Sequence, residues 1–358
     1  MILAQIVPRL PPPEEGVGGI ALSLAAALEG MGIESRFVVP APHGAAAAAA
    51  GLDGVEIAPE PAALAAALEG AGRAILHYAG YGYHPRGVPQ WLADGLALSK
   101  TPLWTQFHEV WATGPPWRSS FWLGTLQRRI VRAIGDRSER ISTSLDLYAG
   151  LIRSAVSDPG RPIEVKPVVS GIGEPSEAPQ YGPRERRLVV FGGPGVRGGA
   201  YGNFAERIEH AARSLDLAEI WDVGPGEVAP RTLGALPVRR LGPLPAPEVS
   251  ALLAESAAGF LAYPLGFLGK SSVFAAYAAH GVLPVCCGRP AEAADVPAGP
   301  RAGEQYWNIG GYAGRNAGDA PAPSDPAGLA AAARSWYSAH SLATQAAELA
   351  AWIRGTRR

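Results

Sequence analysis

Short apolar runs alternate with long alanine-rich stretches along most of the chain, and glycine or proline separates them. A short apolar run between such breakers is typical of a buried strand in a parallel sheet, and an uninterrupted alanine-rich stretch predicts a helix. The predicted strands are residues 2–7, 34–40, 74–78, 102–109, 187–191, 219–223, 239–241, 259–263 and 282–285. The alternation predicts an α/β fold with parallel sheets.

The predicted helices occupy residues 20–29, 126–140, 206–215, 247–257 and 335–353, and another begins at Ser271. A proline-rich stretch, residues 158–183, interrupts the alternation and is typical of an inter-domain connection. The chain has 358 residues, which is enough for two domains with cores of their own.

Composition excludes several classes of protein. The chain is 47% hydrophobic with a net charge of −1, which argues against nucleic acid as its main partner. Its two cysteines, Cys286 and Cys287, are adjacent and predict neither a disulfide framework nor a metal cluster. We find no run long enough for a membrane span and no signal-peptide pattern, so we expect a cytoplasmic protein.

The stretch 257–285 carries the clearest chemistry. It predicts a strand, a loop broken by Pro264, Gly266 and Gly269, and a helix that opens with Lys270-Ser271-Ser272. Free N–H groups, a hydroxyl and a cation at a helix N-terminus favour a phosphate group. A P-loop is the alternative motif, but Pro264 stands where that motif needs glycine. A plain N-cap beside an exposed lysine is the structural alternative.

Lysine is rare enough in this chain to be informative. Of its 31 basic residues only Lys100, Lys166 and Lys270 are lysines, and the rest are arginines. A lysine in the loop before Ser271 therefore indicates a position that needs a compact point charge.

The N-terminal half has polar residues where strands end. His108 and Glu109 close the strand 102–109, and ligands of open α/β sheets bind at such ends. Gly18 and Gly19 precede the first helix without completing a dinucleotide fingerprint, because Leu22 occupies the third glycine position. We interpret these glycines as room for a ligand close to the backbone.

Aromatic residues follow two of these strands. Tyr83 and His84 lie in a predicted loop, residues 80–87, and Trp111 begins a tryptophan-rich segment that is either core or a platform for a sugar ring. The basic helix 126–140 carries three arginines that face either solvent or an acidic membrane surface. They are Arg128, Arg129 and Arg132.

The order of these signals resembles the two-domain GT-B glycosyltransferases, in particular the retaining group that includes glycogen synthase and bacterial mannosyl- and glucosyltransferases. The resemblance covers most of the chain. It implies two Rossmann-like domains facing across a cleft: an acceptor domain, 1–170, and a nucleotide-sugar donor domain, 180–334. The C-terminal helix, 335–358, is expected to pack back on the first domain.

The resemblance also implies roles for residues. The expected donor-binding residues are Gly192, Gly193, Arg197, Lys270, Ser271 and Ser272. The expected acceptor-binding residues are Gly18, Gly19, Tyr83, His84 and Trp111. His108 matches a histidine near the transferred sugar, and Glu109 is a candidate base. The substrate would be a UDP- or GDP-sugar, the acceptor a glycan, lipid or small molecule, and no metal or other cofactor would be needed.

One part of the family pattern is missing. The donor motif normally carries a pair of glutamates, and Leu268 and Ala276 occupy those positions. No acidic residue occurs anywhere in 256–289. A nucleotide-sugar epimerase or hydrolase of the same fold, and a non-catalytic binding protein, therefore remain alternatives to a transferase.

Overall fold

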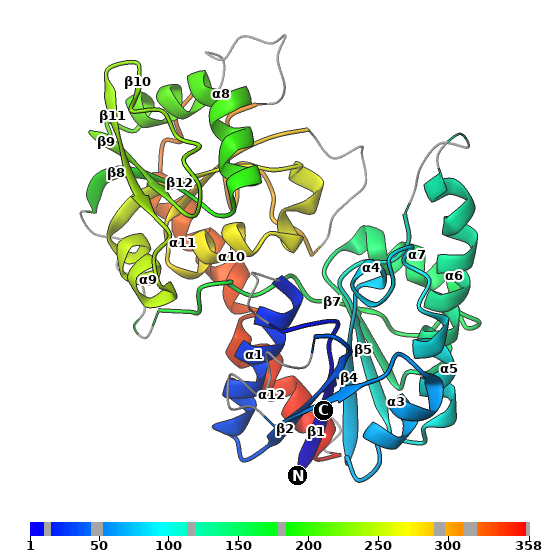
Figure 1. The fold of residues 1–358 in the computed structure, drawn as a ribbon. Helices are drawn as coiled ribbons and strands as arrows, with labels where there is room; N and C mark the ends of the chain where they lie inside the picture. Colours follow the sequence, from blue (N-terminus) through cyan, green and yellow to red (C-terminus); the bar gives the residue numbers. More distant parts are fainter. Residues whose placement is uncertain are drawn as a thin grey trace. The chain divides into compact units, whose positions relative to one another are not determined.

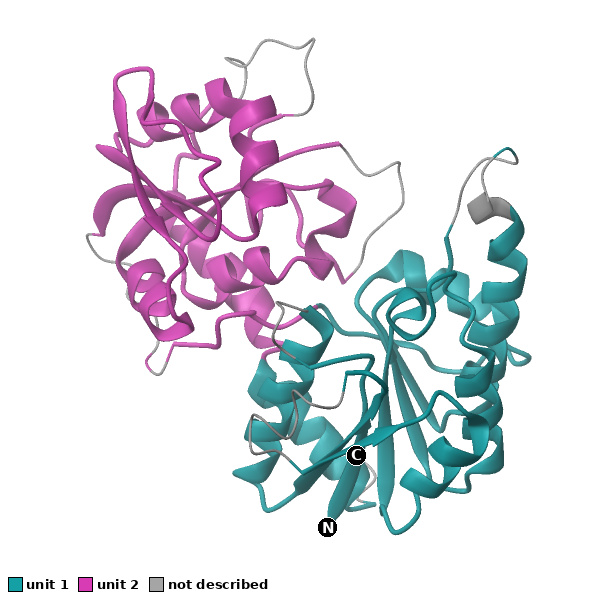
Figure 2. Cartoon of the chain, viewed as in Figure 1, with its two compact units in different colours: residues 1–167, 342–358 teal, residues 168–341 magenta. Residues whose placement is uncertain are grey.

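Two β-sheets organise the chain, one in each unit of the computed structural model (Figures 1 and 2). The first unit comprises residues 1–167 and 342–358, and the second comprises residues 168–341. The structure describes residues 1–10, 16–43, 53–112, 117, 119–175, 177, 184–289, 298–310 and 321–355.

The described strands of the first unit pair in parallel throughout. They are β1 (Ile2–Ile6), β2 (Glu34–Pro40), β3 (Gly54–Ile57), β4 (Arg73–Tyr78), β5 (Leu103–Phe107), β6 (Arg140–Thr143) and β7 (Glu164–Val165). Their order across the sheet is β3-β2-β1-β4-β5-β6-β7. The order reverses between β1 and β4, the kind of switch point where open α/β sheets bind ligands.

Helices cover both faces of this sheet (Figure 1). One face packs against α3 (Pro61–Ala67), α4 (Gly80–Tyr83), α5 (Gln90–Leu98), α6 (Ser119–Arg137) and α7 (Asp146–Ala155). The other packs against α1 (Gly16–Glu29) and α12 (Leu342–Ile353). Neighbouring residues alternate between the faces: Leu3 packs toward α1 and α12, and Ala4 packs toward the other helices.

The second unit repeats the arrangement with one antiparallel pair, β10 with β11. Its strands are β8 (Glu185–Phe191), β9 (Glu219–Val223), β10 (Thr232–Leu233), β11 (Leu236–Gly242), β12 (Ser256–Ala262), β13 (Leu283–Cys287) and β14 (Trp307–Asn308). The described order is β10-β11-β9-β8-β12-β13-β14, so it reverses between β8 and β12.

The helices of the second unit also divide between two faces. The core on one side includes residues of α8 (Pro194–Ser214) and α11 (Pro326–Ser338). The core on the other side includes residues of α9 (Ala246–Glu255), α10 (Ser272–Ala279) and the 3-10 turn η1 (Leu265–Lys270). Residues of β8 and β12 alternate between the two cores, as a strand covered on both faces must.

Several predicted boundaries were wrong. Helix α8 begins at Pro194, far ahead of the predicted start at 206, and it includes a kink at Phe204, where φ is −137°. Its glycine-rich first half weakens helix propensity, but proline at the first turn favours a helix start, and Ala200 and Tyr201 are buried there. Helix α1 likewise begins at Gly16, and the predicted loop 80–87 contains the short helix α4.

The predicted terminal helix, 335–353, is two helices. Helix α11 ends at Ser338 and α12 begins at Leu342. No glycine or proline marks the break, so the sequence pattern contains no signal for it. The division between the units falls at the same place, because residues 342–358 group with the first unit.

None of the described helices combines the length and the apolarity needed to cross a membrane.

Helix α10 packs against the backbone of β12 through one glycine. A Cβ placed on Gly259 would lie 2.4 Å from Cε1 of Tyr277. The Tyr277 ring is fully buried, and its hydroxyl donates to the carbonyls of Val189 and Phe260 at 3.1 Å each. The ring therefore cannot yield without losing these hydrogen bonds.

We expect Gly259→Ala to lower the free energy of unfolding by about 1–3 kcal/mol, the usual cost of overpacking a core. The control is Gly202→Ala in α8, where a Cβ meets nothing within 4 Å; there we expect a gain of about 0.5–1 kcal/mol. Urea unfolding followed by tryptophan fluorescence compares the two. Unfolding of Gly259→Ala at the wild-type urea concentration would contradict the packing described for Tyr277.

Candidate functional site

The carboxyl edge of the second sheet carries a capped helix start. After β12 the chain forms η1, which ends at Lys270, and α10 follows from Ser272. Ser271 is the N-cap: its backbone is extended, and its Oγ accepts a hydrogen bond from the Phe274 amide at 3.2 Å. The cap satisfies one of the first N–H groups of α10, and the others in that turn have no partner within the helix itself.

Two glycines meet this helix start. Gly192 follows β8 with φ of 129°, and a Cβ there would lie 3.2 Å from Cγ2 of Val273. A Cβ on Gly171 would lie 3.2 Å from Cβ and 3.3 Å from Oγ of Ser272. The predicted donor-binding turn Gly192-Gly193 and the predicted helix start therefore lie in contact within the second unit. Lys270, which is half-buried, immediately precedes the N-cap residue Ser271.

Arg197 does not present its guanidinium to a ligand at this helix start, and the prediction that it binds the donor phosphates was wrong. It is fully buried, and Nε and Nη2 donate to the carboxylate of Asp222 at 3.0 and 2.9 Å. Its remaining N–H groups donate to the carbonyls of Gly192, Pro225 and Gly226. All five donors of the guanidinium are thus used. The reason is the early start of α8, which turns Arg197 inward.

No candidate metal site accompanies these residues. Within the described ranges, no three His, Cys, Asp or Glu side chains are grouped so that they could hold a metal ion.

The first sheet places His108 at the end of β5 in a buried polar row. His108 Nε2 lies 3.3 Å from Nδ1 of His77 on β4. His77 Nε2 lies 3.2 Å from Oε1 of Gln5 on β1, and Gln5 Nε2 donates to Ser35 Oγ on β2 at 2.9 Å. His77 has no solvent exposure, and its burial lowers its pKa to about 4. Neither Gln5 nor His77 was singled out from the sequence.

Glu109, the residue after His108, is half-buried. Burial, and to a smaller extent the negative charge of Glu109, raises the pKa of Tyr78 far above its usual range. The hydroxyl of Tyr78 is buried without a hydrogen-bond partner among the described residues.

The predicted acceptor residues have mostly structural positions. Tyr83 is buried, and its hydroxyl donates to the carbonyls of Ile6 and His77. This use of its only proton corrects the expectation that it binds an acceptor. Nδ1 of His84 accepts from the amides of Arg86 and Val88, so this ring nitrogen holds the following turn.

Of the other acceptor candidates, two lie in a helix and the third packs against the core of the first unit. Gly18 and Gly19 belong to the first turn of α1 and not to a loop, and Gly18 is buried there. Trp111 is partly buried against the core on the side of α6, and the Arg128 guanidinium lies 5.8 Å from the centre of its ring.

Arginines of helix α6 are held by neighbouring residues. Arg128 donates to the carbonyl of Ser154 at 2.5 Å. Arg132 donates to Ser157 Oγ and forms an ion pair with Asp136. The same helix exposes the apolar side chains of Trp122 and Leu126.

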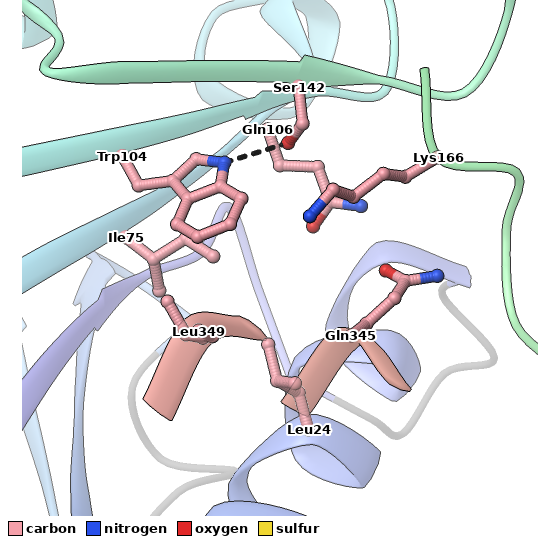
Figure 3. Close-up of a pocket in the computed structure, with 8 residues that line it drawn as sticks. All are labelled: Leu24, Ile75, Trp104, Gln106, Ser142, Lys166, Gln345 and Leu349. Atoms are coloured by element: carbon pink, nitrogen blue, oxygen red, sulfur yellow. Dashed lines mark hydrogen bonds between the residues drawn. The ribbon is translucent and has the colours of Figure 1, made fainter. Parts of the chain in front are cut away.

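A small cavity lined by both apolar and polar side chains lies between the first sheet and α12 (Figure 3). Its lining includes Gln106, Ser142, Lys166 and Gln345, and its volume of about 20 Å³ has room for water. Ser142 Oγ accepts from Trp104 Nε1 at 2.9 Å. Lys166 forms ion pairs with Glu164 and Glu348, so its charge is compensated within the unit.

Comparison with solved structures assigns the fold. No protein-family model matches the chain, and no curated protein sequence does. The Anabaena protein HepE, solved with UDP and glucose, aligns over 99% of this chain and 100% of its own, with a TM-score of 0.64 and 11% identity. WaaG, a glycosyltransferase involved in lipopolysaccharide biosynthesis, aligns over 99% and 100%, with a TM-score of 0.58 and 12% identity.

An alpha-glucosyltransferase solved with UDP and DNA aligns over 99% of both chains, with a TM-score of 0.59 and 10% identity. At these identities the likeness concerns the fold. The chain has the α/β fold of GT-B glycosyltransferases, as the sequence predicted.

Because Arg197 is fully buried against Asp222, we expect its substitution to lower the stability of the protein strongly. We expect Arg197→Met to lower the free energy of unfolding by about 3–5 kcal/mol, because Asp222 would remain buried and charged without its partner. The matched control is Arg213→Met on the same helix, since the Arg213 side chain is 72% exposed and pairs with Glu209. We expect that loss to stay within about 1 kcal/mol. Equal urea midpoints for the two variants would show that the buried pair is not needed.

Proposed function

We propose that the protein is a glycosyltransferase that moves a sugar from a nucleoside-diphosphate sugar to an acceptor. The observation that carries the proposal is the contact between the Gly192 turn and the first turn of α10, which Ser271 caps and Lys270 precedes. Helix N–H groups, a hydroxyl and an ammonium group together favour a diphosphate. The solved structures of the same fold support it, because HepE and the alpha-glucosyltransferase were solved with UDP.

The donor is, on this proposal, a UDP-sugar, with a GDP-sugar as the alternative. HepE has also been solved with UDP-glucose, which favours a hexose as the transferred group. The acceptor would be a glycan, a lipid or a small molecule. The DNA bound by the alpha-glucosyltransferase is not carried over, because this chain has a net charge of −1 and no basic excess to bind a polyanion.

The leaving diphosphate gains negative charge as the glycosidic bond breaks, and the protein must stabilise that charge. In our proposal Lys270 and the first N–H groups of α10 do so, and no metal ion is required. Ser272 adds a hydroxyl beside the same turn. Retention of configuration is part of the proposal by analogy with the family that the sequence resembles, although the family's paired glutamates are replaced by Leu268 and Ala276.

His108 and Glu109 are the proposed reactive residues of the first unit. Both follow β5 at the carboxyl edge of the sheet, where open α/β folds bind substrates. His108 would hydrogen-bond the sugar near the reacting carbon, and Glu109 would accept the proton of the acceptor hydroxyl. Peripheral contact with an acidic membrane would involve Arg129, near the exposed side chains of Trp122 and Leu126.

The missing glutamates favour a second candidate, a nucleotide-sugar epimerase or hydrolase with the same donor site, or a binding protein without turnover. Incubation with UDP-glucose and candidate acceptors separates these functions. A transferase releases UDP faster when its acceptor is present, and a hydrolase releases it equally without one. An epimerase changes the sugar without releasing UDP, and a binding protein does none of these.

Lys270 provides the direct test of the donor site. We expect Lys270→Ala to weaken UDP binding by about 1.5–3 kcal/mol, or about 10- to 150-fold, as for loss of a hydrogen bond to a charged group. Lys270→Arg should recover only part of the affinity, because the guanidinium is longer and planar. Calorimetric titration of UDP measures both.

Lys100→Ala is the matched control, because Lys100 is an exposed lysine of the first unit. It should leave the affinity unchanged. If UDP binds Lys270→Ala and wild type equally tightly while both are folded, the diphosphate site lies elsewhere.

His108 provides the test of the reactive side. We expect His108→Ala to reduce UDP release from UDP-glucose by about 100-fold or more per folded molecule, as for loss of a catalytic hydrogen-bonding group. The free energy of unfolding should fall by only about 1–3 kcal/mol.

His280→Ala is the control, because His280 is a fully buried histidine at the far end of α10, held by Ser250 and the Ala276 carbonyl. His280→Ala should lower the free energy of unfolding without changing the rate of UDP release per folded molecule. A His108→Ala protein that is less stable but releases UDP at the wild-type rate would make His108 a structural residue.

A further inference from the structure

The polar row under α1 and α12 links four neighbouring elements of the first unit. Ser35 lies on β2, Gln5 on β1, His77 on β4 and His108 directly after β5. Successive side chains are joined at 2.9, 3.2 and 3.3 Å. The two ring centres lie 5.5 Å apart and the ring planes are 17° from parallel. With the facing nitrogens 3.3 Å apart, this separation places both nitrogens near the line that joins the ring centres, so the N–H of one ring can point in its own plane toward the lone pair of the other.

The hydrogen bonds of this row have a direction. Gln5 uses its amide nitrogen to donate to Ser35, so its oxygen faces His77. A carbonyl oxygen only accepts, and therefore Nε2 of His77 must carry the proton. His77 is fully buried, and its lowered pKa keeps it neutral, so its Nδ1 has a lone pair. The nitrogen that faces this lone pair, Nε2 of His108, must then be a donor.

We propose that Gln5 and His77 are positioning residues that hold His108 in the tautomer protonated on Nε2. Nδ1 is then the nitrogen of His108 that gains and loses a proton. Neutral His108 can accept a hydrogen bond at Nδ1, and protonated His108 can donate one there, while its bond to His77 is the same in both states. The inference rests on the proposed function only for the part that His108 plays in the reaction.

Without this row, the tautomer of a neutral histidine would depend on its other contacts. The fixed tautomer sets the direction of the hydrogen bond to a sugar hydroxyl, which can itself donate or accept: with Nδ1 unprotonated, neutral His108 accepts the hydroxyl proton. It also explains why a glutamine and a histidine are buried in the middle of strands whose neighbours are apolar. Both polar side-chain atoms of Gln5 and both ring nitrogens of His77 have a partner in the row, so these two buried residues do not carry the cost of an unsatisfied group.

Nitrogen-15 NMR of the histidine-labelled, full-length protein tests the inference directly. The His77 signals are identified by their loss in His77→Gln. We expect His77 to show a protonated Nε2 and an unprotonated Nδ1 between pH 6 and 8, and His108 to keep a protonated Nε2 through its own titration. The opposite pattern, with His77 protonated on Nδ1 and His108 unprotonated on Nε2, would overturn the proposal.

A matched pair of variants tests the role of Gln5. In Gln5→Met the oxygen that requires a proton on His77 Nε2 is gone, so we expect the reversed tautomer to appear at both histidines. In Gln106→Met both rings should keep the wild-type tautomer, because Gln106 occupies the same face of the sheet, opposite His77, without a described hydrogen bond to either ring. Wild-type tautomers in folded Gln5→Met would show that Gln5 does not set the direction of the hydrogen bonds at His77 and His108.

The rate at which each variant releases UDP from UDP-glucose tests whether the tautomer of His108 affects the reaction. We expect Gln5→Met to reduce it by about tenfold or more, since Nδ1 of neutral His108 would carry a proton and could no longer accept one, and Gln106→Met to leave it unchanged. Equal rates in the two variants, with the tautomer reversed only in the first, would remove Gln5 and His77 from the reaction. If the wild-type protein releases no UDP, the proposed function fails, and the NMR result still decides the tautomers.

Discussion

The close approach of Tyr277 to the backbone at Gly259 is the contact on which the candidate donor site depends. It lets α10 lie against β12, while the Tyr277 hydroxyl ties the helix to the carbonyls of two adjacent strands, at Val189 and Phe260. The seated helix brings Val273 against Gly192 and Ser272 against Gly171. The position of the helix start at the edge therefore depends on packing deep in the sheet.

Arg197 shows how one buried charge can organise an edge without taking part in its chemistry. Its guanidinium joins the turn after β8, through the Gly192 carbonyl, to the turn after β9, through the carbonyls of Pro225 and Gly226. The pair with Asp222 compensates the charge and orients the fork. A glycine turn needs such support, because glycine loses the most conformational freedom when it is ordered. Arg197 thus supports the turn and is not available to a ligand, whose charge is assigned to Lys270 in our proposal.

The longer buried strands could be predicted from the sequence because apolar runs between breakers leave few alternatives, and β9 agrees with its predicted range, residues 219–223. Five strands were not predicted, because they are short or contain few apolar residues: β3, β6, β7, β10 and β14. Helix boundaries were less predictable. The glycines of α8 hide a helix that tertiary packing stabilises, and the break after Ser338 contains no breaker. The role of Arg197 could not be predicted either. The sequence around it is the same whether the guanidinium contacts a phosphate or Asp222, because Asp222 is 25 residues away in the chain.

The row of Gln5, His77 and His108 could not be predicted for a related reason. Gln5 and His77 lie between apolar residues of their strands, His108 directly follows β5, and only the strand order β1-β4-β5 makes the three neighbours. A sheet shaped by stability alone would have apolar side chains there, since replacing a buried polar group and its partner with apolar residues is often neutral or stabilising. The row is complete and points toward the carboxyl edge, where His108 ends it. A row of polar side chains that crosses β1 and β4 to reach His108 is explained by a need at the carboxyl edge for a histidine whose proton is held on one nitrogen.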